Sequence, residues 1–589
     1  MILSTLDWAI VVAFFVFSLV VGVATSRRAG KNAGEFFLSG RQMPWWLLGV
    51  SMVATTFSSD TPNLVTDIVR KHGVSGNWLW WAFLLTGMLT VFVYAKLWRR
   101  SGVLTDLEFY ELRYSGRSAA FLRGFRAIYL GVFFNVMIMA TVSLAAIKIG
   151  SVTLGLKPLE TLVIASVVTV IYSSLGGLRS VLLTDFALFV VAMVGSLAAA
   201  WVVVRLPEVG GLEALLENDM VRRRLDFVPD LSDPETFVPL FLMPLAVQWW
   251  STWYPGAEPG GGGYIAQRML AARNEEHAAS ATLFFNIAHY ALRPWPWIIV
   301  ALASLVVFPD LAALSAAFPE LDANLVDHDL AYPAMLRRLP HGLLGIVMAS
   351  LIAAYMSTIS THLNWGSSYI VNDFYLRFLR PEASERALVL LGRVSTALLM
   401  LVTACLALYL HSALQAFQIL LQIGAGTGLL FIMRWFWWRV NAASEITAMV
   451  VSFAIAVYFQ LGDSALPPHV QLLVGVSITT VSWLLAAFIA PPTERTRLAA
   501  FCRKVRPGGP GWRTVERELP PEDRRPDAAW DVPGGLLNMA IGCALVYGTL
   551  FATGYFIKGN LGSALVLLAI AVLASFWLIR RKSRTASMA

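Results

Sequence analysis

Long apolar stretches recur along almost the whole of this 589-residue chain. An α-helix needs about 20 mainly apolar residues to cross the roughly 30 Å hydrocarbon core of a bilayer. Stretches of this length lie near residues 6–26, 44–69, 75–97, 124–152, 157–177, 182–206, 237–268, 278–308, 340–372, 388–411, 412–435, 442–460, 469–490, 535–556 and 560–580. The pattern predicts an all-α, polytopic membrane protein with about fifteen transmembrane helices.

The composition agrees with this class. Hydrophobic residues make up 57% of the chain, charged residues 14%, and the mean hydropathy is +0.65. Most Lys and Arg residues lie in short loops between the apolar stretches, so the net charge of +8 does not indicate a nucleic-acid partner. The first stretch has no basic residues before it and is interpreted as a retained helix. The cysteines Cys405, Cys502 and Cys543 are too scattered for a disulfide framework or a metal cluster.

Basic residues favour one of the two alternating sets of loops. That set includes the loops near residues 27–31, 99–117, 268–273 and 377–380, the segment 495–525 and the tail. It holds roughly three times the Lys and Arg of the other set, which makes it cytoplasmic by the positive-inside rule. We therefore expect a plasma (inner) membrane protein with its N-terminus outside and its C-terminus in the cytoplasm.

Two apolar stretches are predicted to be broken helices. The second contains Asp60 and Pro62, and the seventh contains Pro255, Pro259 and the run 260–263 of four glycines. Proline and glycine interrupt helices, and unpaired backbone survives in a membrane only where it lines a cavity or is buried in protein. A simple packing kink is the alternative, especially at Pro62.

The two breaks lie five stretches apart, which is typical of a transporter built from an inverted 5+5 helix repeat. The expected organisation is an extra helix and first loop (1–43), the first repeat (44–206), an extracellular loop (207–236), the second repeat (237–441), two additional helices (442–490), a cytoplasmic linker (491–534) and two C-terminal helices with a tail (535–589).

Four hydroxyl side chains gather within the ninth stretch, at Ser357, Thr358, Ser360 and Thr361. Helical spacing places Ala354, Ser357, Thr358 and Thr361 on one face, with Ser360 adjacent. A hard cation such as Na⁺ should take neutral oxygens, and a broken helix nearby has free carbonyls. The alternative is that each hydroxyl bonds back to its own helix or serves close packing.

The motif Ala354-x-x-Ser357-Thr358, the second stretch and "YSSLGGLRSVLLTDF" resemble the sodium:solute symporter family, from about residue 5 to 490. The resemblance implies a leucine-transporter-like fold. It also implies a sodium site made by the carbonyls of Ala54, Phe57 and Ala354 and the hydroxyls of Ser357 and Thr358.

A second sodium site, present in some members of the family, corresponds to Asp185, Ser357, Ser360 and Thr361 in this chain. A carboxylate inside a membrane span is costly and usually functional, which favours this site. The alternative is that Asp185 only caps a helix end near Arg179.

The solute is expected near the middle of the membrane, between the broken helices. The candidate binding residues are Ser58, Asp60, Thr61, Asn135, Trp253, Glu258, Tyr264, Arg293, Gln418 and Gln422. Trp253 and Tyr264 are also gate candidates. The Arg293 guanidinium matches a carboxylate, so its partner is either an acidic solute or, in the preferred interpretation, a structural ion pair with Glu258 or Asp60.

These features predict a secondary active transporter that couples inward sodium flow to uptake of a small organic solute by alternating access. The solute is a sugar, an amino acid or a carboxylate, and the cargo cation is Na⁺, one ion or two. Apart from the solute, the expected partner is the lipid bilayer, and no nucleic acid is expected. The sequence does not indicate the oligomeric state. A sensor or channel-like protein on the same scaffold is the alternative. The sequence contains no catalytic motif that indicates an enzyme.

Overall fold

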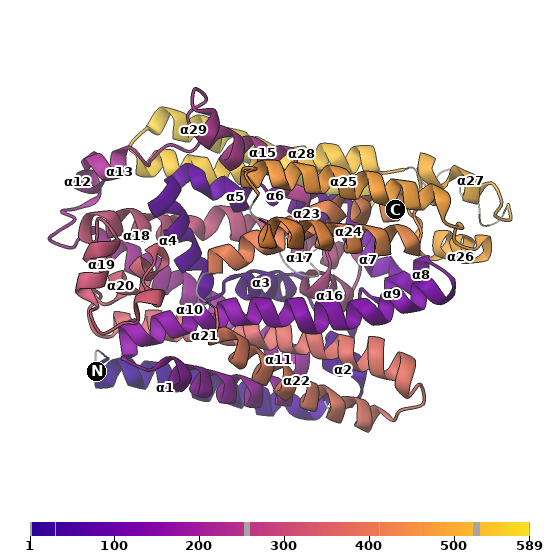
Figure 1. The fold of residues 1–589 in the computed structure, drawn as a ribbon, viewed down its shortest axis with the longest axis horizontal. Helices are drawn as coiled ribbons and strands as arrows, with labels where there is room; N and C mark the ends of the chain where they lie inside the picture. The colour runs from indigo at the N-terminus through magenta and orange to yellow at the C-terminus, as the bar shows by residue number, and fades with distance from the viewer. Residues whose placement is uncertain are drawn as a thin grey trace.

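Helices account for nearly all of the regular structure. The structure, a computed structural model, describes residues 3–29, 31–251, 259–410, 413–462, 464–521, 523 and 530–587. Within this part of the chain the only β-type pairing is an isolated bridge between Met43 and Ala272. The helices run mostly along the long axis of the molecule (Figure 1). The predicted all-α fold is confirmed.

The first predicted repeat contains α3 (Trp45–Thr56), α4 (Asp60–His72), α5 (Trp78–Trp81), α6 (Leu84–Leu89), α7 (Ala95–Ser101), α8 (Glu108–Arg113), α9 (Gly116–Ile128), α10 (Asn135–Leu154) and α11 (Pro158–Val204). The second contains α14 (Pro234–Phe237), α15 (Met243–Ala246), α16 (Gly263–Ala271), α17 (Glu275–Ile287), α18 (Pro294–Val307), α21 (Leu343–Ser368), α22 (Glu385–Ala407) and α23 (Ala413–Phe436). Around them lie α1 (Thr5–Ala29), α2 (Ala33–Leu38), α24 (Ala442–Leu461), α25 (Pro468–Ile489), α28 (Val532–Ile557) and α29 (Leu561–Ser587).

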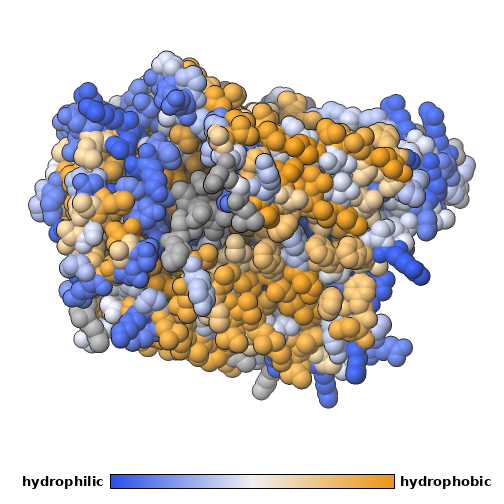
Figure 2. Space-filling view, viewed as in Figure 1, coloured by the Kyte–Doolittle hydropathy of each residue, from blue (hydrophilic) through white to orange (hydrophobic). Residues whose placement is uncertain are grey.

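On the face seen in Figure 2, a broad apolar band covers the middle of the molecule, between two more hydrophilic ends. Exposed Leu, Ile, Val and Phe side chains of α1, α11, α22, α25 and α29 supply much of the apolar surface. In the described residues, eleven helices are long and apolar enough to cross a membrane, and three shorter apolar helices accompany them. These features make the chain a multi-pass membrane protein, while the number of fifteen crossings stays a prediction.

Both predicted breaks are present in the backbone. In the second stretch α3 ends at Thr56, and α4 begins at Asp60. In the seventh stretch no helix is formed between the short 3₁₀ turn at Gln248–Trp250 and α16, over the described residues. Gly260 and Gly261 there have φ values of 91° and 85°, which glycine adopts at little steric cost.

A third interruption occurs inside α11, between the two stretches predicted near 157–177 and 182–206. Gly177 has φ 55° and ψ −161°, so the helical conformation is interrupted there. A Cβ atom built on Gly177 would lie 2.7 Å from the carbonyl oxygen of Phe36. The second glycine of the "LGG" motif is therefore required by both conformation and space.

Polar segments lie at the two ends of the bundle. The short helices α12 (Leu212–Glu217), α13 (Asp219–Arg222), α19 (Leu311–Ala317) and α20 (Ala331–Leu336) lie at one end. The helices α26 (Arg495–Val505) and α27 (Arg513–Glu516) lie at the other end, next to α8 (Figure 1). The loops 207–236 and 309–339 thus share one end, and the linker 491–534 lies at the opposite end.

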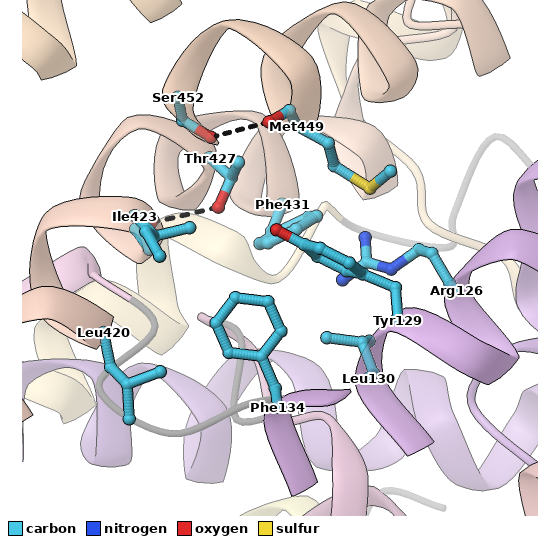
Figure 3. A pocket seen from close by; sticks show the side chains of 11 residues that line it. Arg126, Tyr129, Leu130, Phe134, Leu420, Ile423, Thr427, Phe431, Met449 and Ser452 are labelled. Atoms are coloured by element: carbon cyan, nitrogen blue, oxygen red, sulfur yellow. Dashed lines mark hydrogen bonds between the residues drawn. The ribbon is translucent and has the colours of Figure 1, made fainter. Parts of the chain in front are cut away.

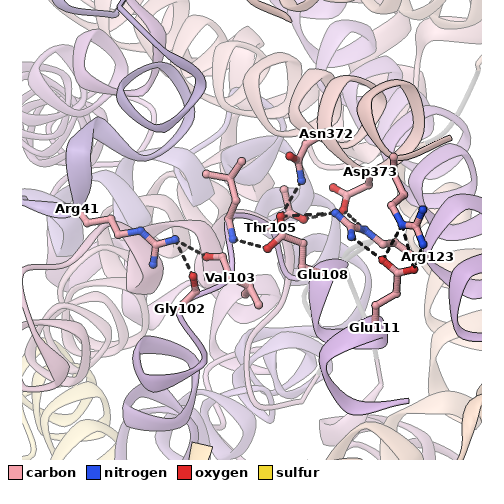
Figure 4. A network of polar contacts seen from close by, with 11 residues as sticks. Arg41, Gly102, Val103, Thr105, Glu108, Glu111, Arg123, Asn372 and Asp373 are labelled. Atoms are coloured by element: carbon pink, nitrogen blue, oxygen red, sulfur yellow. Dashed lines mark hydrogen bonds and ion pairs between the residues drawn. The ribbon is translucent and has the colours of Figure 1, made fainter. Parts of the chain in front are cut away.

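A charged network at the α8 end fixes the loop after α7 to α9 and to the π-helical end of the α21 segment (Figure 4). Arg123 Nε donates to Asp373 Oδ1 at 2.7 Å, and Arg123 Nη1 donates to Glu111 Oε2 at 2.7 Å. Arg377 Nη2 donates to Glu111 Oε1 at 2.8 Å. Partial burial favours a raised pKa at Glu111, but the hydrogen bonds from Arg377 and Arg123 hold that pKa below its ordinary value.

Candidate functional site

The break between α3 and α4 leaves backbone carbonyls that other parts of the chain must satisfy. Val53 O accepts from Phe57 N at 2.8 Å and from Thr56 Oγ1 at 2.9 Å. Thr56 O accepts from Thr61 Oγ1 at 3.2 Å. Ala54 O accepts from Phe57 N at a longer 3.2 Å. Hydroxyl side chains on both sides of the break therefore stabilise the unwound segment.

The carbonyl of Thr55 is reached from α21. Thr358 Oγ1 donates to Thr55 O at 2.8 Å, and the hydroxyl oxygens of Thr55 and Thr361 are 3.2 Å apart. The hydroxyl-bearing face of α21 thus faces the broken end of α3, in the region where the sequence predicted a sodium site from Ala54, Phe57, Ala354, Ser357 and Thr358. Thr55 itself was not among the predicted ligands.

The other predicted hydroxyls have different partners. Ser357 Oγ donates to Asp185 Oδ1 at 2.5 Å, so α21 contacts α11 there. Ser51 Oγ of α3 donates to the other oxygen of Asp185. Ser360 Oγ donates to Ser357 O of its own helix at 3.1 Å. Asp185 of α11 is therefore a buried acceptor that joins its own helix to α3 and α21, rather than the cap of a helix end.

The predicted position of Arg268 is wrong. The sequence placed it in a cytoplasmic loop, but the whole residue is buried on α16. Its Nη2 donates to Thr361 Oγ1 at 2.9 Å and to Ser51 Oγ at 3.2 Å. The apolar run before Arg268 continues into Met269, Leu270 and Ala271, which was a signal that the helix continues past the charge.

A cavity of about 120 Å³ lies beside the α3–α4 break. Four predicted solute-binding residues line it, and they are Ser58, Asp60, Thr61 and Arg293. Its other walls come from Thr55, Thr56, Leu64, Val65, Trp80, Phe83, Ile138, Thr141, Val142, His289, Tyr290, Thr358 and Leu420. Because Thr358 is common to the cavity and the α3–α21 junction, the two predicted sites are contiguous.

Arg293 holds the most polar wall of this cavity. Its Nη2 hydrogen-bonds His289 Nδ1, and its Nη1 donates to Val53 O at 3.4 Å. The guanidinium also lies 5.2 Å from the ring centre of Trp297. No Asp or Glu of the described residues is within ion-pair range of Arg293, so the preferred pairing with Asp60 is not formed in this structure.

Two predicted binding residues lie away from the cavity. Asn135 Nδ2 donates to His362 O at 2.9 Å, and its Oδ1 bonds His362 Nδ1, so it joins α10 to α21. Tyr264 is buried beneath Arg268, whose guanidinium carbon is 5.7 Å from the centre of its ring. Trp253, Glu258 and the side chains of Gln418 and Gln422 lie outside the described part of the chain.

Sequence reasoning missed several cavity residues, including Thr55, Thr56, Thr141 and Tyr290. Thr55 and Thr56 directly precede the break, so their proximity to it was the available signal. Thr141 lies on the apolar helix α10 and Tyr290 lies on the π-helical segment Ala288–Leu292, and only the packing of these two elements brings them to the cavity.

A second, smaller cavity of about 40 Å³ lies among α9, the π-helical segment Tyr129–Phe134, α23 and α24 (Figure 3). Arg126, Tyr129 and Phe431 line it, and the Arg126 guanidinium lies 4.9 Å from the ring centre of Phe431. Leu420 lines both cavities. Of the predicted site residues whose side chains the structure describes, none lines the smaller cavity, so the larger one is the candidate solute site.

A bundle of membrane-crossing helices with interrupted helices, and with a cavity beside one of the breaks, is typical of secondary transporters. The model of the sodium:solute symporter family matches residues 36–452, and the chain belongs to that family. It is accordingly a sodium-coupled transporter of a small solute, and not an enzyme.

Named relatives agree with this assignment. The chain is 23% identical to a sodium/glucose cotransporter of Vibrio parahaemolyticus, over 81% of this chain and 89% of the relative. It is 26% identical to sodium/myo-inositol cotransporter 2 of Sus scrofa, over 85% and 80%. A solved structure of a Na⁺-coupled sialic acid symporter, substrate-bound and outward-open, has a TM-score of 0.67 at 20% identity and covers 83% of this chain and 99% of its own. That likeness supports the leucine-transporter-like fold.

Proposed function

We propose that one sodium ion binds between the broken end of α3 and the hydroxyl-bearing face of α21. Its ligands would be the carbonyls of Ala54, Phe57 and Ala354 and the hydroxyls of Ser357 and Thr358. The observation that carries this proposal is the 2.8 Å approach of Thr358 Oγ1 to Thr55 O at the break. Neutral hydroxyl and carbonyl oxygens suit a hard monovalent cation that must be released in each cycle.

The solute binds in the cavity beside Ser58, Asp60, Thr61 and Arg293. The relatives are named for glucose, myo-inositol and sialic acid, so hydroxylated solutes come first among the sugars, amino acids and carboxylates that we propose. Arg293 suits a carboxylate or a hydroxyl, and Trp80 offers an aromatic face. Asn135 and Tyr264 would then support or gate the site rather than form its wall. Trp253, Glu258, Gln418 and Gln422 remain proposed solute-binding residues, with Trp253 also a proposed gate.

The coupling of sodium binding to solute binding follows from Thr358, which belongs to both proposed sites. Thr358 borders both the ion and the solute, so sodium binding orders the break that the solute contacts. With both bound, the outer side closes and the inner side opens. One cation crossing 100 mV releases about 2.3 kcal/mol, and a tenfold gradient adds about 1.4 kcal/mol. Together they support roughly 500-fold accumulation of a neutral solute.

The proposed setting is the plasma (inner) membrane, with the N-terminus outside and the C-terminus in the cytoplasm. The proposed division keeps the two repeats at 44–206 and 237–441, with the flanking segments as support. The charge distribution among the loops favours this orientation.

The test is uptake by the purified protein in proteoliposomes, with a sodium gradient imposed and glucose, myo-inositol, sialic acid and amino acids supplied in turn. We expect uptake of one class to require sodium and to stop when potassium replaces it. Thermal stability should rise with sodium alone. If sodium changes neither uptake nor stability, the sodium site is wrong. A steady sodium leak without any solute would instead favour a channel-like protein.

A further inference from the structure

The buried carboxylate of Asp185 lacks a direct cationic neighbour. It accepts hydrogen bonds from Ser51 of α3 and Ser357 of α21, and the whole residue is fully buried. No Lys, Arg or His of the described residues forms an ion pair with it. A buried charge of this kind is costly unless an opposite charge lies close by.

The nearest balancing charge is the guanidinium of Arg268. Its Nε and Nη2 donate to Ser51 Oγ at 3.3 and 3.2 Å, and Ser51 in turn donates to Asp185. One hydroxyl therefore joins the guanidinium to the carboxylate. Arg268 has the same full burial as Asp185, so water does not screen the attraction between the two charges.

Arg268 makes further hydrogen bonds to oxygens of the side chains around it. Nη2 donates to Thr361 Oγ1 at 2.9 Å, and Thr55 Oγ1 is 3.5 Å away. Nη1 donates to Gln267 Oε1 at 3.0 Å. The group made of Ser51, Thr55, Asp185 and Thr361, which we term the Asp185 oxygen cage, comes from α3, α11 and α21 and surrounds one cationic side chain.

A second sodium ion would need two of these residues, Asp185 and Thr361, as ligands. Of the predicted ligands Asp185, Ser357, Ser360 and Thr361, the Thr361 hydroxyl accepts from Arg268 and the Ser360 hydroxyl donates to its own helix. A metal cation placed among the rest would also lie beside a guanidinium at low dielectric, where like charges repel strongly.

We infer that Arg268 acts as a tethered cation, which fills the Asp185 oxygen cage in place of a second sodium ion and sets the coupling at one sodium per solute. This inference rests on the proposed function, because it assumes that the Thr358 site binds the single ion. Arg268 lies on α16, the half-helix that follows the second break, so a permanent charge of the protein takes the place of a transported one.

The experiment counts sodium ions with ²²Na⁺ alone, on the purified full-length protein. The unaltered chain should bind one ion. Arg268→Gln should bind two, since the carboxylate is left without its cation, and the double variant Arg268→Gln/Asp185→Asn should return to one. Arg268→Lys, which keeps a positive charge, should stay at one.

Arg273→Gln is the matched control, because it removes an exposed arginine just beyond α16, and its count should stay at one. Two ions in the unaltered chain, or one ion in a folded Arg268→Gln, would overturn the inference and leave the proposed function intact. No ion bound to the unaltered chain would overturn both. The count on the unaltered chain remains decisive where Arg268→Gln fails to fold.

Discussion

At the scale of single residues, the hydroxyl of Thr358 is placed for two tasks. It donates its proton to Thr55 O, which satisfies a carbonyl released by the break. A hydroxyl oxygen keeps two lone pairs when it donates, and these remain available for a cation. The same bond that holds the unwound segment in place therefore prepares a ligand, so fold stability and ion binding depend on one side chain.

We predict that Thr358→Val raises the sodium concentration needed for half-maximal thermal stabilisation by roughly 10- to 100-fold, because a hydrogen-bond-strength contact to a charged group contributes about 1.5–3 kcal/mol. Valine keeps the shape of threonine and removes only the oxygen. Thr358→Ser is the matched control and should retain near-normal sodium affinity. A folded valine variant with unchanged sodium dependence would remove Thr358 from the ligand set.

At the scale of residues, the sequence located positions near the cavity where the signal was local. Ser58, Asp60 and Thr61 lie directly at the break that the second stretch predicts, and all three line the cavity, while their role in solute binding stays a prediction. The position of Asn135 away from the cavity could not be predicted, because its partner His362 is 227 positions away in the chain. Arg268 failed because a charge at the end of an apolar run looks like a loop residue until its buried partners are known.

At the scale of secondary-structure elements, glycines mark two interruptions of the helical backbone, at Gly177 within α11 and at Gly260 and Gly261 before α16. The π-helical segments Thr90–Tyr94, Tyr129–Phe134 and Ala288–Leu292 lie within longer helical stretches, and such segments often mark functional regions. Proline and glycine clusters reveal the large breaks in a sequence. A π-helical segment leaves no comparable trace, because these three contain no proline and no glycine cluster, and none of them was predicted.

We predict that Gly177→Ala destabilises the protein by about 1–3 kcal/mol through its backbone conformation alone, and by more through contact with the Phe36 carbonyl. The expected result is a lower Tm in detergent, with less folded protein recovered. Gly195→Ala, in the same helix α11, is the matched control. A Cβ on Gly195 meets only ordinary contacts at 3.5 Å, and alanine favours a helix, so its Tm should be equal or higher. Equal losses in the two variants would contradict this account.

At the scale of the whole molecule, the two ends of the bundle differ in a way that relates to sidedness. The end that carries α26 and α27 also holds the network of Arg123, Glu111 and Arg377 (Figures 1 and 4). Basic side chains close to membrane ends mark the cytoplasmic face. Cytoplasmic placement of this end would put α12 and α19 outside, so one labelling experiment tests the orientation of every helix at once.

We predict that a membrane-impermeant maleimide labels Ala214→Cys on α12, but not Thr514→Cys on α27, in sealed right-side-out vesicles. Both positions are exposed, so accessibility depends only on the side of the membrane. The exposed Cys405 is first replaced by alanine, and the buried Cys502 and Cys543 serve as internal blanks. Inverted vesicles provide the control, since there Thr514→Cys should react and Ala214→Cys should not. The reverse labelling pattern would mean that the bundle has the opposite orientation in the membrane. Sodium released at the proposed inner side would then leave toward the outside, against the direction that uptake requires.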